Sequence, residues 1–589
     1  MSARRRTLLR LSVIFGIGAL LISGRPSLGD EGAKWAEGDE ILAAAAHPAA
    51  VKAGFAVLEE GGTAVDAAIA MQAVLSLVEP QSSGIGGGGF LLFYDRKSGR
   101  VTAFDGRETA PRAVDETLFL DSDGKPMAFM DAALGGRAVG VPGVMRMLAL
   151  AHRRHGRLTW ARLFAPAIRL AEEGFPISPR LHAVLARHAA FFRKRGITAP
   201  AQLGEAGPYF FTKDLNPKPV GTILKNPAYA RSLRLIAERG VAEFYTGSIA
   251  RDIVRAVREN PFSPGKMTLA DLAAYEAVAE PPLCGRYRVY RLCAMGPPSS
   301  GGSTMLAMLG ILEGFDLARM RPWGLQAVHL YAEASRLAYA DRDRYTADAR
   351  FYPVPLPGLI DKGYLARRRQ LIRLDHAMKT VTPGHPPGAK DAGAGTGPDH
   401  PSTSHLVAID REGNAVTFTT TVQIAFGSFV MVDGFLLNNQ LTDFDFNPRD
   451  ERGRPVANRP EGGKKPRSSM TPTFVFGPQG RLVMGIGSPG GSRIISYVTK
   501  TVIGVLDWQM PIEQAIAAPN LLGRGETLAI EKGSALEALV PALEAMGHRI
   551  QRQEMVSGLH GFTVRYDAEG RPHYRGGADP RREGIVRAR

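Results

Sequence analysis

A glycine- and proline-rich stretch divides this sequence into two parts with different patterning. Ten of the nineteen residues from 383 to 401 are Gly or Pro, and apolar residues show no period there. Neither a helix nor a strand persists through such a composition. The chain is therefore expected to fold as a helix-rich part and a β-rich part that are joined by a flexible connector.

The part before the connector is predicted to be mainly helical. Two helices are expected between residues 48 and 78, separated by Gly61 and Gly62. A glycine-rich turn at 83–89 then leads into a strand at 90–94, which pairs with 101–104 as a hairpin. The 3.6-residue apolar period predicts further helices at 141–155, 159–173, 227–239, 248–258, 302–315 and 324–345.

The part after the connector is predicted to be β-rich. Strands at 406–409 and 415–421 flank the turn sequence DREGN, which is typical of a β-hairpin. Further strands are expected at 429–432, 473–476 and 482–486, and helices at 492–506, 511–518 and 535–546. This order indicates an α+β fold in which helices pack on antiparallel strands.

The first 29 residues have the features of an export signal. Arginines precede an apolar stretch at 11–22, and small residues stand at Ser27 and Gly29. The apolar stretch is too short to span ~30 Å of hydrocarbon comfortably as a helix. Removal of residues 1–29 is expected, giving a periplasmic or secreted protein, while the export route stays open.

The charge and the cysteines exclude several classes of protein. The formal net charge is +16, and loss of the five arginines in the first 29 residues would leave +11. The remaining basic clusters are short and lack interleaved aromatics, so no nucleic-acid partner is expected. Two cysteines, Cys284 and Cys293, are too few for a four-cysteine zinc or iron–sulfur site. Whether they pair is left open.

The common cofactor and hydrolase motifs are absent or misplaced. The string Gly84-x-Gly86-x-x-Gly89 matches a dinucleotide fingerprint, but a helix enters it and a strand leaves it, which is the reverse of the required order. A tight turn that lets another segment approach is the simpler interpretation. No nucleophile-elbow serine or P-loop occurs, and neither a metal nor an organic cofactor is expected.

Thr403 follows the connector and directly precedes the strand-forming sequence. A threonine at a strand start is usually structural. A hydroxyl is a weak nucleophile without an adjacent base, but a threonine that becomes an N-terminus carries its own base, an α-amine of pKa ~8. Scission of the 402–403 bond would create that arrangement and would give the flexible connector a purpose.

Nine stretches resemble the γ-glutamyltransferase family of N-terminal-nucleophile hydrolases, in the order in which that family has them. They are VEPQSSGIGGGGFLLFYD, FDGRETAPRA, GVPG, GFPISPRL, PPSSGGST, TSHLVAIDREGNAVTFTTT, LLNNQLTDF, RSSMTPT and GSPGGSR. The resemblance implies a four-layer αββα sandwich made jointly by two fragments of one precursor. These are a large chain of residues 30–402, ending in a pre-cleavage linker at 383–402, and a small chain of 403–589.

The resemblance also implies which residues carry the chemistry. Thr403 corresponds to the nucleophile that cleaves the precursor and attacks the substrate, and Thr421 to the residue that orients it. Gly490 and Gly491 correspond to backbone donors for the oxyanion, a task that suits residues without a side chain. Arg107 corresponds to the guanidinium that binds the substrate α-carboxylate. Ser468 and Ser469 would assist Arg107, and Gln440 and Asp443 would accept the α-ammonium group.

The activity implied is hydrolysis of γ-glutamyl amides such as glutathione, or γ-glutamyl transfer to an amino-acid or peptide acceptor. Three features depart from the family. The expected substrate-binding residue Gln423 stands where an asparagine is common, the segment 427–438 is shorter, and the lid segment 445–467 contains no tyrosine. A related cephalosporin or glutaryl-type acylase, which differs in the head-group pocket, therefore stays open. So does a catalytically dead, uncleaved periplasmic binding protein.

Overall fold

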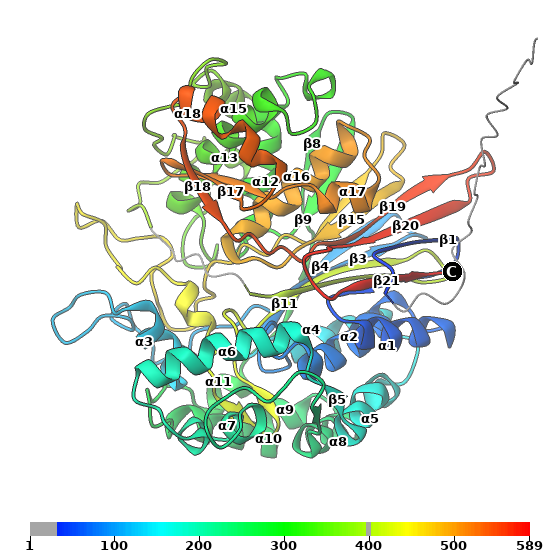
Figure 1. The fold of residues 1–589 in the computed structure, drawn as a ribbon, viewed down its shortest axis with the longest axis vertical. Helices are drawn as coiled ribbons and strands as arrows, with labels where there is room; N and C mark the ends of the chain where they lie inside the picture. Colours follow the sequence, from blue (N-terminus) through cyan, green and yellow to red (C-terminus); the bar gives the residue numbers. More distant parts are fainter. Residues whose placement is uncertain (1–31, 396–401) are drawn as a thin grey trace, which may run out of the picture. The chain divides into compact units, whose positions relative to one another are not determined.

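Two seven-stranded sheets face each other at the centre of the fold, and helices cover both outer faces (Figure 1). The computed structural model describes residues 32–395 and 402–589. The predicted signal at 1–29 and the connector residues 396–401 lie outside the described residues. The arrangement is the four-layer αββα sandwich that the sequence resemblance implies.

The first sheet, called the β10 sheet here, mixes strands from both sides of the connector. Its order is β21 (Ile585–Ala588), β2 (Leu42–Ala45), β10 (Ser404–Ile409), β11 (Ala415–Thr421), β3 (Gly88–Asp95), β4 (Arg100–Asp105) and β7 (Val278–Glu280). All neighbouring strands are antiparallel. Because β10 lies between β2 and β11, neither part of the chain completes this sheet alone.

The second sheet, called the β15 sheet, is mixed in the same way. Its order is β1 (Trp35–Gly38), β20 (Pro572–Ala578), β19 (His560–Tyr566), β15 (Leu482–Gly487), β14 (Thr473–Phe476), β9 (Tyr290–Ala294) and β8 (Leu283–Tyr287). Cys284 and Cys293 lie directly opposite each other on β8 and β9 and form a disulfide. The structure thus answers the pairing question that the sequence left open.

Helices form the outer layers because each buries apolar side chains in one of the two large core clusters. Outside the β10 sheet lie α1 (Pro48–Glu59), α2 (Ala64–Val78), α4 (Val144–His155), α5 (Ala165–Glu173), α6 (Pro179–Lys194), α8 (Pro227–Arg239) and α10 (Ser248–Arg258). Every residue of α2 is buried, and its first turn is closed by a capping box between Thr63 and Asp66. Outside the β15 sheet lie α12 (Gly301–Leu312), α13 (Leu325–Tyr345), α16 (Ile494–Leu506) and α17 (Ile512–Ala517).

The structure confirms most predicted elements and corrects three. The predicted strand at 429–432 shrinks to β12 (Met431–Val432), paired with β13 (Phe435–Leu436), because Phe429 has a φ of 61° that no regular strand accommodates. The predicted helices at 159–173 and 535–546 each begin as a 3₁₀ turn and restart as an α-helix, α5 and α18 (Val540–Ala545). Each restart has a proline in its first turn, Pro166 and Pro541, whose missing N–H cannot continue the preceding hydrogen bonds.

The described part of the connector contains neither a helix nor a strand, as predicted, but it is held against the body. Gly384 N–H donates to Asp341 at 2.7 Å, and Gly384 O accepts from Tyr345 OH at 2.7 Å. Gly393 N–H donates to Pro455 O at 3.0 Å. These bonds attach residues 383–395 to α13 and to segment 445–467. No helix in the described parts of the chain is long and apolar enough to cross a membrane.

The glycine-rich turn at 83–89 allows the close backbone approach expected from its sequence. A Cβ on Gly87 would lie 2.0 Å from the carbonyl oxygen of Thr421, and one on Gly86 would lie 2.2 Å from that of Leu436. Real Cβ atoms do not come so close to backbone oxygens. The turn therefore fixes the end of β11, where Thr421 lies.

We expect Gly87→Ala to lower the free energy of unfolding by about 1–3 kcal/mol, because the new methyl group overpacks a rigid backbone contact. The measurement is the thermal unfolding midpoint. Gly84→Ala is the matched control in the same turn, since the atoms nearest to its new Cβ lie 3.8 Å away. Equal midpoints for the two variants would contradict the role given to this contact.

Candidate active site

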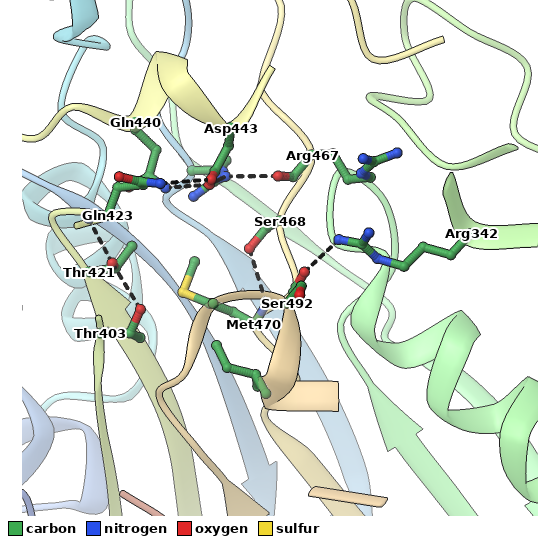
Figure 2. A pocket seen from close by; sticks show the side chains of 14 residues that line it. Arg342, Thr403, Thr421, Gln423, Gln440, Asp443, Arg467, Ser468, Met470 and Ser492 are labelled. Atoms are coloured by element: carbon green, nitrogen blue, oxygen red, sulfur yellow. Dashed lines mark hydrogen bonds and ion pairs between the residues drawn. The ribbon is translucent and has the colours of Figure 1, made fainter. Parts of the chain in front are cut away.

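One cavity collects nine of the ten residues that the resemblance assigns (Figure 2). Its lining residues are Arg107, Arg342, Thr403, Thr421, Gln423, Gln440, Asp443, Arg467, Ser468, Ser469, Met470, Gly491, Ser492 and Ile494. The tenth residue, Gly490, lies in the same turn as Gly491. The cavity sits where β10 begins and β11 ends, so that segments far apart in the sequence converge on it.

The two threonines are brought together by the β10–β11 register. Ser404 pairs with Thr420, which places Thr403, just before β10, beside Thr421 at the end of β11. The Thr403 hydroxyl donates to Thr421 Oγ1 at 3.0 Å, and the same oxygen accepts from Gln423 N–H at 2.8 Å. Figure 2 shows the two hydroxyls pointing toward each other at one side of the cavity.

The peptide bond between Ser402 and Thr403 is held on several sides. Gly490 N–H donates to Ser402 O at 3.0 Å, and the Ser402 hydroxyl donates to Gln81 O at 2.9 Å. Arg582 Nη1 donates to Thr403 O at 2.9 Å. Thr403 has a φ of 97°, a strained conformation for a β-branched residue. The carbonyl that precedes Thr403 is thus already hydrogen-bonded by the SPGG turn.

The turn that supplies this donor depends on its glycines. Gly490 and Gly491 have φ values of 138° and 61°, which side-chain-bearing residues rarely adopt. A Cβ on Gly490 would also lie 2.6 Å from the ring of Tyr497. The backbone conformation that presents the Gly490 N–H to Ser402 O therefore depends on glycine at these positions.

Asp443 is the centre of a second group of residues, across the cavity from the SPGG turn. Its carboxylate accepts from Arg107 Nη2 at 2.5 Å, Gln440 Nε2 at 2.7 Å and Gln423 Nε2 at 3.1 Å. The Asp443 side chain is 24% exposed, whereas that of Arg107 is 1% exposed. Arg107 also donates to the carbonyls of Pro466 and Arg467. A cation and an anion thus face one cavity, which suits a zwitterionic head group.

The two serines have hydroxyls oriented by other donors. Ser468 Oγ accepts from Met470 N–H at 3.1 Å, and Ser469 Oγ accepts from Arg342 Nη2 at 2.6 Å. An oxygen that accepts from a fixed N–H keeps its own O–H for donation. Both hydroxyls can therefore donate to an anion in the cavity.

Sequence reasoning missed two arginines in the lining, Arg342 and Arg467. Both are buried, and burial lowers the pKa of Arg342 to about 10. Arg467 could have been noticed, since it directly precedes Ser468 in RSSMTPT. Arg342 lies in α13, which carries no motif, so only its packing reveals it.

Glu108, next to Arg107, is a fully buried carboxyl group whose burial raises its pKa to about 8. Its two oxygens have no hydrogen-bond partner among the described residues. At neutral pH Glu108 is therefore mostly protonated, and Asp443 is the acidic residue that lines the cavity.

No group of three or more His, Cys, Asp or Glu side chains in the described parts of the chain is arranged to hold a metal ion.

Comparison with known proteins identifies relatives of this chain. A glutathione hydrolase proenzyme of Bacillus subtilis (strain 168) is 36% identical over 523 residues, which cover 87% of this chain and 85% of the relative. Acylase ACY 1 proenzyme of Pseudomonas sp. (strain SE83) is 34% identical over 533 residues, which cover 89% of this chain and 90% of the relative. The crystal structure of cephalosporin acylase from Bacillus halodurans superimposes with a TM-score of 0.82 at 25% identity, covering 98% of this chain and 99% of that one.

The family model described as gamma-glutamyltranspeptidase matches residues 50–588, nearly the whole described part of the chain. This match includes both threonines, the SPGG turn and every strand of the two sheets except β1 and β2. The chain therefore belongs to the γ-glutamyltranspeptidase family of enzymes.

Proposed function

We propose that this chain is a proenzyme that cleaves itself between Ser402 and Thr403 and then hydrolyses or transfers γ-glutamyl groups of glutathione-like amides. One observation carries the proposal: the Thr403 hydroxyl bonds to Thr421 while the carbonyl before it accepts from Gly490. The proposed nucleophile then directly follows its target carbonyl in the chain, and that carbonyl already accepts from the proposed oxyanion donor. Relatives named glutathione hydrolase proenzyme support the same activity.

In the self-cleavage step, Thr403 Oγ1 attacks the carbonyl carbon of Ser402, and the oxyanion forms against Gly490 N–H. The C–N bond then breaks while the proton lost by the hydroxyl passes to the nitrogen, leaving an ester on Thr403 Oγ1 and a free α-amine. Water hydrolyses the ester to a carboxylate on Ser402. The strained φ of Thr403, a conformation that costs about 1–3 kcal/mol, ceases to exist once this bond breaks, so scission also releases strain.

In the substrate step, the new α-amine of Thr403 accepts the proton of the Thr403 hydroxyl. The hydroxyl oxygen then attacks the γ-carbonyl carbon of the substrate. Gly490 and Gly491 N–H groups stabilise the oxyanion, a contribution worth about 3 kcal/mol per donor in comparable sites. The amine product leaves with a proton from the α-ammonium. Water or an acceptor amine then takes the glutamyl group from the Thr403 ester.

The head group is proposed to bind across the cavity. Its α-carboxylate would face Arg107 and the hydroxyls of Ser468 and Ser469. Its α-ammonium would face Asp443 and the side-chain oxygen of Gln440, which is buried and has no partner among the described residues. The side-chain oxygen of Gln423 is in the same state and supplies another acceptor.

An acylase that removes glutaryl-type groups is the second candidate. A glutaryl group ends in a carboxylate and carries no ammonium, so it needs positive charge and no acid. Arg342 and Arg467 add such charge to the cavity lining, and acylases occur among the relatives. The partly exposed carboxylate of Asp443 favours the γ-glutamyl substrate, since an amino group is what it can bind.

Thr403→Ala tests the nucleophile. The wild-type chain should run on a denaturing gel as two fragments, the smaller one beginning at Thr403, and should hydrolyse a γ-glutamyl anilide. The variant should stay one chain and show only background hydrolysis, because the alanine has no attacking oxygen. Thr403→Ser is the control, since it changes the same residue and keeps an attacking hydroxyl. An uncleaved Thr403→Ala protein with normal turnover would refute the assignment.

Asp443→Asn separates the two substrate classes. We expect kcat/KM for a γ-glutamyl anilide to fall about 10- to 100-fold, the usual range for losing a hydrogen bond to a charged group. For a glutaryl anilide, kcat/KM should stay unchanged or rise, because that substrate has no ammonium group for Asp443 to bind. Asp450→Asn, in segment 445–467, controls for a lost carboxylate. A wild-type preference for the glutaryl anilide would favour the acylase instead.

A further inference from the structure

An arginine outside the cavity lining reaches the main chain of the proposed nucleophile. Thr403 lies at the edge of the β10 pairing with β2, which begins only at Leu406 opposite Ala45. The carbonyl of Thr403 therefore has no strand partner on that side. Arg582, in the turn between β20 and β21, fills this position by donating from Nη1 to Thr403 O at 2.9 Å.

The Arg582 side chain is buried, which makes its charge costly. The residue is 6% exposed, and burial lowers the pKa of its guanidinium to about 9. Its Nε has no hydrogen-bond partner among the described residues. A Cβ on Gly558 would lie 2.7 Å from Arg582 Cδ, so a glycine makes room for the side chain. A neutral donor could fill the same hydrogen bond at lower cost, which suggests that the charge itself has a role.

Charged groups of both signs surround Arg582. Glu79 and Asp579, both fully buried, attract it, and Arg180 repels it. Arg180 Nε lies 3.3 Å from Glu79 Oε1. Removing the positive charge of Arg582 or the negative charge of Glu79 would therefore change the potential at Thr403 in opposite directions.

The remaining groups near this turn complete the charge pattern. Glu583 accepts from Arg180 N–H at 3.0 Å, and Lys34 Nζ donates to Arg582 O at 2.7 Å. Burial lowers the pKa of His560 to about 3, so this ring is neutral at working pH. Tyr497, on α16, is fully buried and also interacts electrostatically with Arg582.

We propose that Arg582 is a positioning residue that holds the main chain of Thr403 and keeps its freed α-amine uncharged. This inference rests on the proposed self-cleavage, because the amine exists only after it. A free α-amine has an ordinary pKa of about 7.7–8.0, so most of it would be protonated at pH 7. A nearby positive charge lowers that pKa and so increases the fraction that can act as the base.

The test is the pH dependence of kcat for a γ-glutamyl anilide. In Arg582→Gln the acid limb should move up by about one pH unit, since the amine loses a neighbouring positive charge. In Glu79→Gln the acid limb should move to lower pH, because a negative charge is lost. In Arg582→Lys the acid limb should stay near its wild-type position, because the positive charge is kept. KM should change little, because none of these residues lines the cavity. Arg288→Gln is the matched control, an arginine that donates to the main-chain carbonyls of Glu313 and Phe315.

Opposite shifts in Arg582→Gln and Glu79→Gln support the proposal, because loss of structure alone does not change sign with charge. A folded Arg582→Gln protein that stays one chain on a gel supports the positioning role, since self-cleavage needs Thr403 held in place, and Glu79→Gln then tests the effect of charge on the amine. If Arg582→Gln does not fold, Glu79→Gln alone tests the proposal, and an acid limb at lower pH supports it. Unmoved limbs, or shifts in the same direction, overturn it. If the wild-type chain neither cleaves itself nor hydrolyses the anilide, the proposed function fails instead.

Discussion

The pairing of β10 between β2 and β11 is the interaction on which the site depends. It sets Thr403 beside Thr421, and it leaves the Thr403 carbonyl beyond the end of β2, where Arg582 reaches it. A slip of one residue between β10 and β11 would turn every side chain of β10 to the opposite face. The buried residues of β10 on both faces prevent such a slip, since Leu406 belongs to one core cluster and Val407 to the other.

The same pairing determines what a cut after Ser402 would do to the fold. Both sheets contain strands from before and after the connector, and both core clusters draw on both parts. Two fragments produced by such a cut would share their hydrophobic cores and would have no independent surface along which to separate. The mixed sheets therefore allow a backbone bond at the active site to break without loss of the surrounding structure.

Local patterns in the sequence predicted individual elements and hairpins but not the contacts between distant parts of the chain. Helices α1 and α2 and the hairpins at β3–β4 and β10–β11 depend on neighbouring residues, so periodicity and turn residues suffice to find them. The contact of Arg107 with Asp443 joins residues 336 positions apart, and here only the family resemblance brought the two together. At Phe429 a local pattern gave a wrong prediction. The apolar run 429–432 predicted a strand, but the positive φ of Phe429 is incompatible with a regular strand. Arg342, Arg467 and Arg582 were not predicted because a charged residue in a sequence indicates a solvated surface, and only tertiary packing shows that these are buried.

The hydrogen bonds that Asp443 already makes affect which substrates such a site can bind. In the structure its carboxylate accepts from Arg107, Gln440 and Gln423, so an entering substrate exchanges contacts that already exist. A head group with both a carboxylate and an ammonium can replace each side of the Arg107–Asp443 pair with an opposite charge. A head group with a carboxylate alone competes with Asp443 for Arg107 and leaves a partly buried acid without its cation, which is costly. Because Glu108 is mostly neutral at pH 7 and adds little negative charge, this penalty depends mainly on Asp443. The proposed discrimination between the two substrate classes would therefore follow from a charge pair that exists before either substrate binds.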